Sequence, residues 1–321
     1  MSAPATTVPY VLTFGETMAL MRADRPGPLA HASGLSLSIG GSESNVAIGL
    51  CRLGVPVAWC GRVGDDSLGI LVEREIRAEG VDARVIVDPD APTGLMIKES
   101  RTPSVQRVTY YRSGSAGSRL TAQDIDEELI TGAGLLHVSG ITAALSAGCQ
   151  DTLRHAVAVA RGAGTLVSFD FNYRGNLWDR DTAGEFYRDI LAQADLVFAG
   201  DDEAAIAVGA GSDPTDLAHK IAAYGPRQVV IKLGGEGAVA LIDGEQYHRT
   251  AVPIDALDTV GAGDAFVAGY LAELILGHSP GERLETAAKT GAFACLVPGD
   301  WEGFPRRHEL GILDIQETVI R

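Results

Sequence analysis

Residues 258–266 read Asp-Thr-Val-Gly-Ala-Gly-Asp-Ala-Phe, and an apolar stretch continues from there to Leu276. Phe266, Tyr270 and Leu274 recur near helical spacing, which predicts a helix that begins in the glycine turn. Two glycines let the chain turn sharply and let bare backbone approach a ligand. The first N–H groups of a helix have no acceptor within it and lie at the positive end of its dipole, so the turn is suited to an anion such as phosphate.

The acidic residue of this turn, Asp264, is a poor choice for a site that only binds phosphate, because a carboxylate repels it. Its position makes sense for a base that takes a proton from a hydroxyl group attacking that phosphate. The alternative is that Asp264 only caps the helix. Gly-x-Gly-Asp by itself does not decide between these interpretations, so other parts of the chain must.

Composition limits the class of protein. The chain has 321 residues, 46% hydrophobic content and a net charge of −16, enough for one large or two small domains. Basic clusters are absent, which argues against nucleic acid, and the acidic excess would repel an anionic membrane surface. No apolar run approaches the roughly 20 residues that span a bilayer. Four scattered cysteines without a Cys-x-x-Cys pair indicate reduced thiols and a cytoplasmic protein.

Short apolar runs alternate with helical stretches along the chain. We expect strands at 10–14, 57–60, 135–139, 165–171, 196–198, 228–232 and 238–242. We expect helices at 43–53, 67–79, 150–162, 182–193, 214–224, 262–276 and 281–296. This alternation predicts an α/β fold of three layers, with helices on both faces of a mostly parallel central sheet. Ligands of such folds bind outside the carboxyl ends of the strands.

Two early segments, about 18–39 and 93–112, have β-type sequences with no helix between their strands. They are either edge strands or a small antiparallel lid beside the main sheet. The stretch Tyr111-Arg112-Ser113-Gly114 has the character of a binding loop and favours the lid. Because repeats and low-complexity linkers are absent, we expect one domain over 1–321 with the lid inserted in it.

Several nucleotide and catalytic motifs are missing. The chain has no Gly-Lys pair and therefore no P-loop, and no Gly-x-Gly-x-x-Gly follows the first strand. The protein-kinase motifs and the Gly-x-Ser-x-Gly nucleophile elbow are also absent. What remains is a set of glycine-rich turns at 40–45, 234–237 and 261–264.

Together, Gly-Gly-x-x-x-Asn at 40–45 and Asp-Thr-Val-Gly-Ala-Gly-Asp at 258–264 resemble the ribokinase-like (phosphofructokinase-B) family of sugar kinases. The resemblance extends from Tyr10 to the C-terminus. Within the family, the chain is most similar to the 2-keto-3-deoxygluconate kinases, through the stretches 15–16, 110–118, 139–142, 170–174, 177–178 and 302–305.

This resemblance implies ATP-dependent transfer of the γ-phosphoryl group to the terminal (6-) hydroxyl of 2-keto-3-deoxygluconate. The alternative is a sister kinase for a neutral sugar, such as fructose or ribose, or for a nucleoside. A non-catalytic sugar-binding protein on the same fold is expected to lack the base, and Asp264 is present.

The resemblance also implies site residues. Asp264 would be the base, beside the amide-rich turn formed by Gly261, Ala262 and Gly263. The implied sugar-side residues are Glu16, Gly41, Asn45, Tyr110, Arg112, Ile141, Arg174 and Asp264. The two arginines suit the carboxylate of a sugar acid, which a neutral sugar lacks. Alternatively, Arg112 is a solvated loop residue and Arg174 pairs with a carboxylate such as Asp170.

On the nucleotide side, the resemblance implies Lys232, Gly234, Gly237, Gly261, Gly263, Ala292 and Cys295. It also implies Mg²⁺, which the family's Asn-x-x-Glu element helps to hold, largely through water. The chain keeps the glutamate as Glu203 but has Gly200 in place of the asparagine, which weakens the metal assignment. Some relatives hold a monovalent cation near Asp258, and the sequence leaves this open.

Another departure lies in the lid, where Met96 stands at a position that is often tyrosine in the sugar-acid kinases. The lost hydroxyl leaves room for a related substrate such as 2-keto-3-deoxygalactonate. The expected partners are therefore a sugar acid and ATP. The resemblance also implies a homo-oligomer, a dimer or larger, because lids of this family often pair edge to edge and an exposed sheet edge invites pairing.

Overall fold

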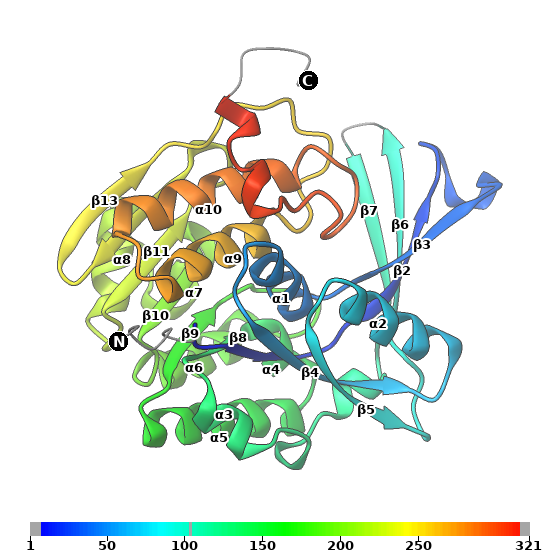
Figure 1. The fold of residues 1–321 in the computed structure, drawn as a ribbon, viewed down its shortest axis with the longest axis horizontal. Coiled ribbons are helices and arrows are strands. Elements are labelled where there is room, and N and C mark those ends of the chain that lie inside the picture. Colours follow the sequence, from blue (N-terminus) through cyan, green and yellow to red (C-terminus); the bar gives the residue numbers. More distant parts are fainter. Residues whose placement is uncertain (1–7, 103–104, 315–321) are drawn as a thin grey trace, which may run out of the picture.

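The computed structural model describes residues 8–102 and 105–314. Its larger sheet has nine strands in the order β13-β12-β11-β10-β9-β8-β1-β4-β5 (Figure 1). These strands are β1 (Val11–Phe14), β4 (Val57–Gly64), β5 (Asp82–Asp88), β8 (Leu135–Ser139), β9 (Leu166–Asp170), β10 (Leu196–Gly200), β11 (Gln228–Lys232), β12 (Ala238–Ile242) and β13 (Glu245–Arg249). All neighbouring strands are parallel except the β11–β12 and β12–β13 pairs.

Helices cover both faces of this sheet, as the alternating pattern predicts (Figure 1). One face packs against α1 (Ser42–Arg52), α2 (Ser67–Ala78), α9 (Ala262–Ile275) and α10 (Pro280–Ala294). The other packs against α3 (Glu127–Gly132), α4 (Gly140–Leu145), α5 (Ala147–Ala163), α6 (Arg180–Leu191), α7 (Asp201–Val208) and α8 (Pro214–Ala222). The expected three-layer α/β fold is therefore confirmed.

Local sequence accounts for the helix ends. Asp66, Ser146, Asp179 and Asp213 each precede a helix, and their side chains accept hydrogen bonds from its first turn. All seven expected helices are present within a few residues. The sequence pattern does not predict β5, β13 or the short helices α3, α4 and α7. These elements are edge strands or have at most eight residues, so their periodicity is weak.

A second sheet of four strands projects beside the first, on the right in Figure 1. Its strands are β2 (Met18–Ala23), β3 (Leu35–Gly40), β6 (Leu95–Thr102) and β7 (Val105–Tyr111), in the order β3-β2-β6-β7. We call it the lid sheet. The β2–β3 and β6–β7 pairs are antiparallel, whereas β2 and β6 run parallel. The strands come from the two segments for which the sequence predicts a lid.

The carboxyl ends of the parallel strands bring several polar side chains to one edge of the larger sheet. Ser139, Asp170, Gly200 and Lys232 are the last residues of β8, β9, β10 and β11, and Glu16 follows β1 closely. Within the described ranges, no helix is long and apolar enough to cross a membrane. All four cysteines are described and none forms a disulfide.

Candidate active site

The glycine turn before α9 has a backbone that requires glycine. Gly261 caps the helix with φ of 78°, in the left-handed region. A Cβ atom at Gly261 would lie 1.8 Å from the carbonyl oxygen of Asp300. The amide of Ala262 donates to the carbonyl of Thr259 at 3.3 Å, whereas those of Gly263 and Asp264 have no acceptor within the helix. Gly263 and Asp264 thus offer the amides best placed to hold an anion.

The carboxylate of Asp264 is held by side chains from the first glycine turn. Ser42 donates to Oδ1 and Asn45 donates to Oδ2, each at 2.8 Å. Asn172 in turn donates to the hydroxyl of Ser42 at 2.8 Å. Burial raises the pKa of Asp264 above its ordinary value, while the bonds from Asn45 and Ser42 act in the opposite direction. The carboxyl is therefore oriented as well as shifted in pKa.

A cleft of about 360 Å³ opens in front of Asp264. The lid sheet provides one wall, and the carboxyl edge of the larger sheet and the α9 turn provide the other. The lining residues are Met96, Lys98, Val108, Tyr110, Asp170, Asn172, Arg174, Lys232, Thr259, Val260, Gly261, Gly263, Asp264 and Asp300. We call it the polar cleft.

Arg174 is the exposed cation of the polar cleft. Within the described part of the chain its guanidinium makes no ion pair or hydrogen bond, and Asp170 pairs with Lys232 instead. The alternative that Arg174 is a structural partner of Asp170 therefore does not hold. Its charge is left to attract an anionic group in the cleft.

Arg112 pairs with a buried carboxylate beside the polar cleft. Its Nε donates to Glu16 at 2.7 Å, and the hydroxyl of Ser115 donates to the same carboxylate. The side chains of Arg112 and Glu16 are 10% and 1% exposed, so Arg112 is not a solvated loop residue. The guanidinium stacks over the ring of Tyr110, which lines the cleft. Arg112 thus orients Tyr110 while its charge is balanced by Glu16.

The other expected sugar-side residues lie around these groups. Asn45 holds Asp264, and Gly41 begins α1 where a Cβ atom would lie 2.4 Å from the carbonyl oxygen of Glu16. Ile141 is buried in α4 and is not a lining residue of the polar cleft. A direct contact of Glu16, Gly41, Arg112 or Ile141 with a sugar stays a prediction.

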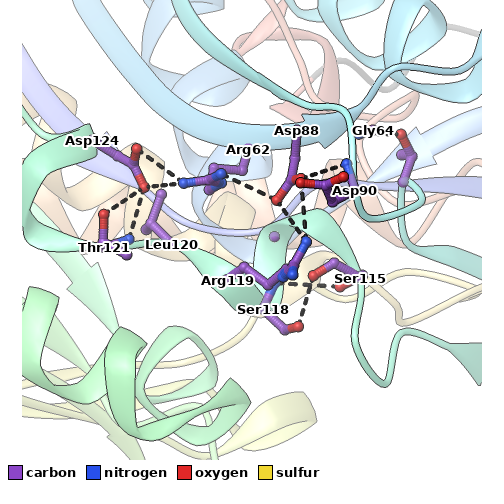
Figure 2. Close-up of polar contacts among 12 residues, drawn as sticks. Arg62, Gly64, Asp88, Asp90, Ser115, Ser118, Arg119, Leu120, Thr121 and Asp124 are labelled. Atoms are coloured by element: carbon purple, nitrogen blue, oxygen red, sulfur yellow. Dashed lines mark hydrogen bonds and ion pairs between the residues drawn. The ribbon is translucent and has the colours of Figure 1, made fainter.

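A chain of ion pairs supports the loop that follows the lid sheet (Figure 2). Arg62 of β4 bridges Asp88 of β5 and Asp124, and Arg119 also pairs with Asp88. Asp88 is buried. This network fixes the segment of Ser115, which contacts Glu16, so it supports the wall behind Arg112. No short motif marks it in the sequence, because its members are up to 62 residues apart.

A second, largely apolar cleft of about 590 Å³ adjoins the first. Its lining includes six of the seven expected nucleotide residues: Lys232, Gly234, Gly237, Gly263, Ala292 and Cys295. The seventh, Gly261, lines the polar cleft. The two clefts share Lys232, Thr259 and Gly263, so they meet at the N-terminus of α9.

Lys232 stands at this junction. Its Nζ lies 2.8 Å from both carboxylate oxygens of Asp170. Burial disfavours the charge of the ammonium, but the attraction of Asp170 and Glu203 outweighs it and raises the pKa of Lys232. The lysine is therefore charged at neutral pH where an anion would cross from one cleft to the other.

Glu203 uses both carboxylate oxygens on backbone amides. Oε1 accepts from Tyr173 at 2.8 Å and Oε2 accepts from Gly200 at 2.7 Å. The described residues also contain no group of three or more His, Cys, Asp or Glu side chains placed to hold a metal ion. Glu203 therefore does not suit direct metal ligation in this arrangement.

Four further residues complete the site and were missed by sequence reasoning: Ser42, Lys98, Asn172 and Asp300. Ser42 and Asn172 hold Asp264, directly or in series. Asp300 is buried in the polar cleft, and burial raises its pKa to about 7. Lys98 could have been found from the sequence. It follows the apolar residues 95–97 of a lid strand, and a lysine buried in such a strand requires a partner of opposite charge.

Two clefts that meet at an anion-binding helix N-terminus, with a carboxylate facing the junction, define a phosphotransferase for small hydroxyl compounds. The family model "pfkB family carbohydrate kinase" matches residues 8–307. The chain is therefore a carbohydrate kinase of the pfkB family.

Individual relatives agree with this. A 2-dehydro-3-deoxygluconokinase of Bacillus subtilis is 38% identical over 96% of both chains. A 2-dehydro-3-deoxygalactonokinase of Haloferax volcanii is 32% identical over 90% of this chain and 92% of the relative. Among solved structures, a protein described as ribokinase II of E. coli, in complex with ATP and Mg²⁺, is 25% identical with a TM-score of 0.88, covering 95% of this chain and 99% of the other. A fructokinase of Vibrio cholerae with fructose, ADP and potassium bound is 25% identical with a TM-score of 0.85, covering 96% and 99%.

Proposed function

We propose that the protein transfers the γ-phosphoryl group of ATP to the 6-hydroxyl of 2-keto-3-deoxygluconate, also written 2-dehydro-3-deoxygluconate. The observation that carries this proposal is Arg174, which lines the cleft that faces Asp264 and has no ion-pair partner among residues 8–102 and 105–314. An exposed guanidinium that lines a cleft and has no carboxylate partner there suits an anionic substrate, and the sugar acid provides a carboxylate.

In the proposed reaction, the sugar lies in the polar cleft with its terminal hydroxyl at Asp264. The carboxylate takes the hydroxyl proton while the sugar oxygen forms its bond to the γ-phosphorus and the bond to ADP breaks. Ser42 and Asn45 keep Asp264 aimed at the junction. Because burial raises its pKa, Asp264 is a better proton acceptor than an exposed aspartate.

We propose that ATP binds in the larger cleft, with its base along the apolar wall that includes Ala292 and Cys295. Lys232 and the amides of Gly263 and Asp264 would hold the negative charge that passes between the clefts. Gly234 and Gly237 have positive φ values of 54° and 106°, so this turn presents backbone rather than side chains to the cleft.

Magnesium bound with ATP would neutralise the phosphate oxygens during transfer. The residues fit a metal that keeps its waters and arrives with the nucleotide, because Mg²⁺ is commonly held by one or two carboxylates plus substrate phosphates. Glu203 would contribute through water, since its own oxygens are occupied by the amides of Tyr173 and Gly200.

Met96 of the lid sheet affects which sugar acid the polar cleft accepts. Met96 is 4% exposed, lines the polar cleft and lies opposite Tyr110 in the β6–β7 pair. A thioether cannot donate the hydrogen bond that a tyrosine would, so the C4 epimer 2-keto-3-deoxygalactonate is a second candidate substrate. A neutral sugar such as fructose remains the alternative from a sister group, and it would leave Arg174 without an anionic partner.

The proposal also covers the domain organisation, the cellular location and the oligomeric state. We propose one kinase domain with the lid inserted at 18–39 and 93–112, working in the cytoplasm, where ATP is available and thiols stay reduced. Leu35 and Leu37 are exposed on β3 at 43% and 51%. This apolar edge supports a homo-oligomer formed through the lid.

The test is an ADP-release assay coupled to NADH oxidation, run with 2-keto-3-deoxygluconate, 2-keto-3-deoxygalactonate, gluconate, fructose and ribose. We expect turnover with the 2-keto-3-deoxy acids and little with neutral sugars. Faster turnover of fructose or ribose at equal concentration would overturn the substrate assignment and leave the kinase class intact.

A further inference from the structure

One charged pair joins the lid sheet to the glycine turn of the anion site. Nζ of Lys98, on β6, lies 2.5 Å from Oδ2 of Asp258, 160 residues away in the chain. The two side chains are 2% and 1% exposed. A pair so fully buried is costly to form and leaves a strongly disfavoured charge when either partner is removed.

The carboxylate of Asp258 also holds the backbone on both sides of the anion site. Its Oδ1 accepts from the amide of Val260 and its Oδ2 from that of Gly299, both at 3.1 Å. Val260 precedes Gly261, and Gly299 precedes Asp300, whose carbonyl packs against Gly261. The position of the anion-binding turn therefore depends on this carboxylate staying in place.

The buried carboxylate of Asp258 needs a counter-ion, and the ammonium of Lys98 provides it. Burial raises the pKa of the neighbouring Asp300, and the ammonium of Lys98 opposes this rise. A free cation beside Asp258 would share Oδ2 with this ammonium and would be repelled by it. The residues therefore do not fit a free monovalent cation at Asp258, which the family resemblance leaves open.

We propose that Lys98 is a positioning residue that replaces a free monovalent cation at Asp258. Because Lys98 belongs to the lid sheet, the lid supplies the positive charge that balances Asp258 beside the anion turn. The inference concerns the turn and not the sugar, so it stands whichever carbohydrate is phosphorylated.

The first test uses the wild-type protein in potassium, sodium or tetramethylammonium chloride at equal ionic strength. We expect kcat/KM and the melting temperature to agree among the three salts, with rates within about twofold, because no site binds the cation. Saturable activation by potassium, or a potassium-specific rise in melting temperature, would overturn the proposal.

The second test removes the charge and keeps the bulk with Lys98→Met. We expect kcat to fall by about 10²-fold, because a small displacement of the turn misplaces the reacting groups. Lys98→Arg should retain more activity than Lys98→Met. The matched control is Arg107→Met on β7, whose side chain is 74% exposed, and it should behave as wild type.

Chemical rescue separates positioning from general stability. Lys98→Ala leaves a cavity beside Asp258, and added methylammonium or potassium should restore kcat saturably while the control variant does not respond. If Lys98→Met does not fold, the uncharged pair Lys98→Met/Asp258→Asn replaces it. Full activity of Lys98→Met, or of the uncharged pair, would overturn the positioning role.

Discussion

The carboxamide of Asn45 donates a 2.8 Å hydrogen bond to Oδ2 of Asp264. A residue of the first glycine turn thus holds the proposed base, which belongs to the last glycine turn. The two residues are 219 positions apart, and Ser42 holds the other carboxylate oxygen. Base and binding turn are thus one unit built from α1 and α9.

Asp264→Asn should abolish turnover and leave sugar binding nearly intact. The variant keeps the shape of the side chain but cannot accept the hydroxyl proton, and general-base catalysis contributes about 10²–10⁴-fold. The kcat and the sugar dissociation constant from calorimetry are the measurements. A kcat within about tenfold of wild type, a barrier change of only ~1.4 kcal/mol, would show that Asp264 is not the base.

Loss of the holding groups should shift the pH profile. The bonds from Ser42 and Asn45 lower the pKa of Asp264, so Ser42→Ala should raise it and move the acidic limb of kcat to higher pH. Asn45→Ala should act in the same direction. Ser36→Ala, an exposed residue of the lid sheet, is the control. An unchanged acidic limb in both variants would mean that this limb does not report Asp264.

The fold class and the turn before α9 could be predicted from the sequence because both depend on local patterns. Gly261 and Asp264 belong to one short motif, and strand–helix alternation is visible without tertiary contacts. The partners of the site side chains were less accessible. Arg112 is balanced by Glu16, 96 residues away, and Lys98 by Asp258, 160 residues away. Such pairs are decided by packing of the lid against the main sheet, which no local pattern encodes.

Arg174→Ala should raise KM for a sugar acid and change kcat less. Hydrogen bonds to charged groups contribute about 1.5–3 kcal/mol, so we expect a rise of roughly 10- to 100-fold in KM. Arg180→Ala is the matched control, because Arg180 is exposed at the start of α6 and lies outside both clefts. Equal kinetics of the Arg174 variant and wild type with a sugar acid would refute the carboxylate contact.

Asp300→Asn should stabilise the protein most at alkaline pH. Burial raises the pKa of this carboxyl to about 7 in the folded protein, so the folded state prefers the protonated form. Its contribution to stability is full below the pKa of the unfolded chain, near 3.8, and is lost as pH rises through 7. From pH 5 to pH 8 the variant should gain about 2 kcal/mol relative to wild type. Denaturant unfolding at the two pH values measures this, and a difference that does not change with pH would contradict the assigned burial effect.

Comparing Gly261→Ala with Gly277→Ala measures the effect of the close contact between Gly261 and the backbone of Asp300. Both glycines have nearly the same φ, 78° and 80°, so the backbone penalty for alanine is shared, at about 1 kcal/mol. Only Gly261 packs against the backbone of Asp300, since a Cβ atom at Gly277 meets open space. We therefore expect Gly261→Ala to lower both the melting temperature and kcat well beyond Gly277→Ala, because the carbonyl of Asp300 and the turn must move apart. If the two variants lose the same stability and Gly261→Ala keeps its kcat, then contact between the turn and Asp300 does not set the position of the phosphate-binding amides.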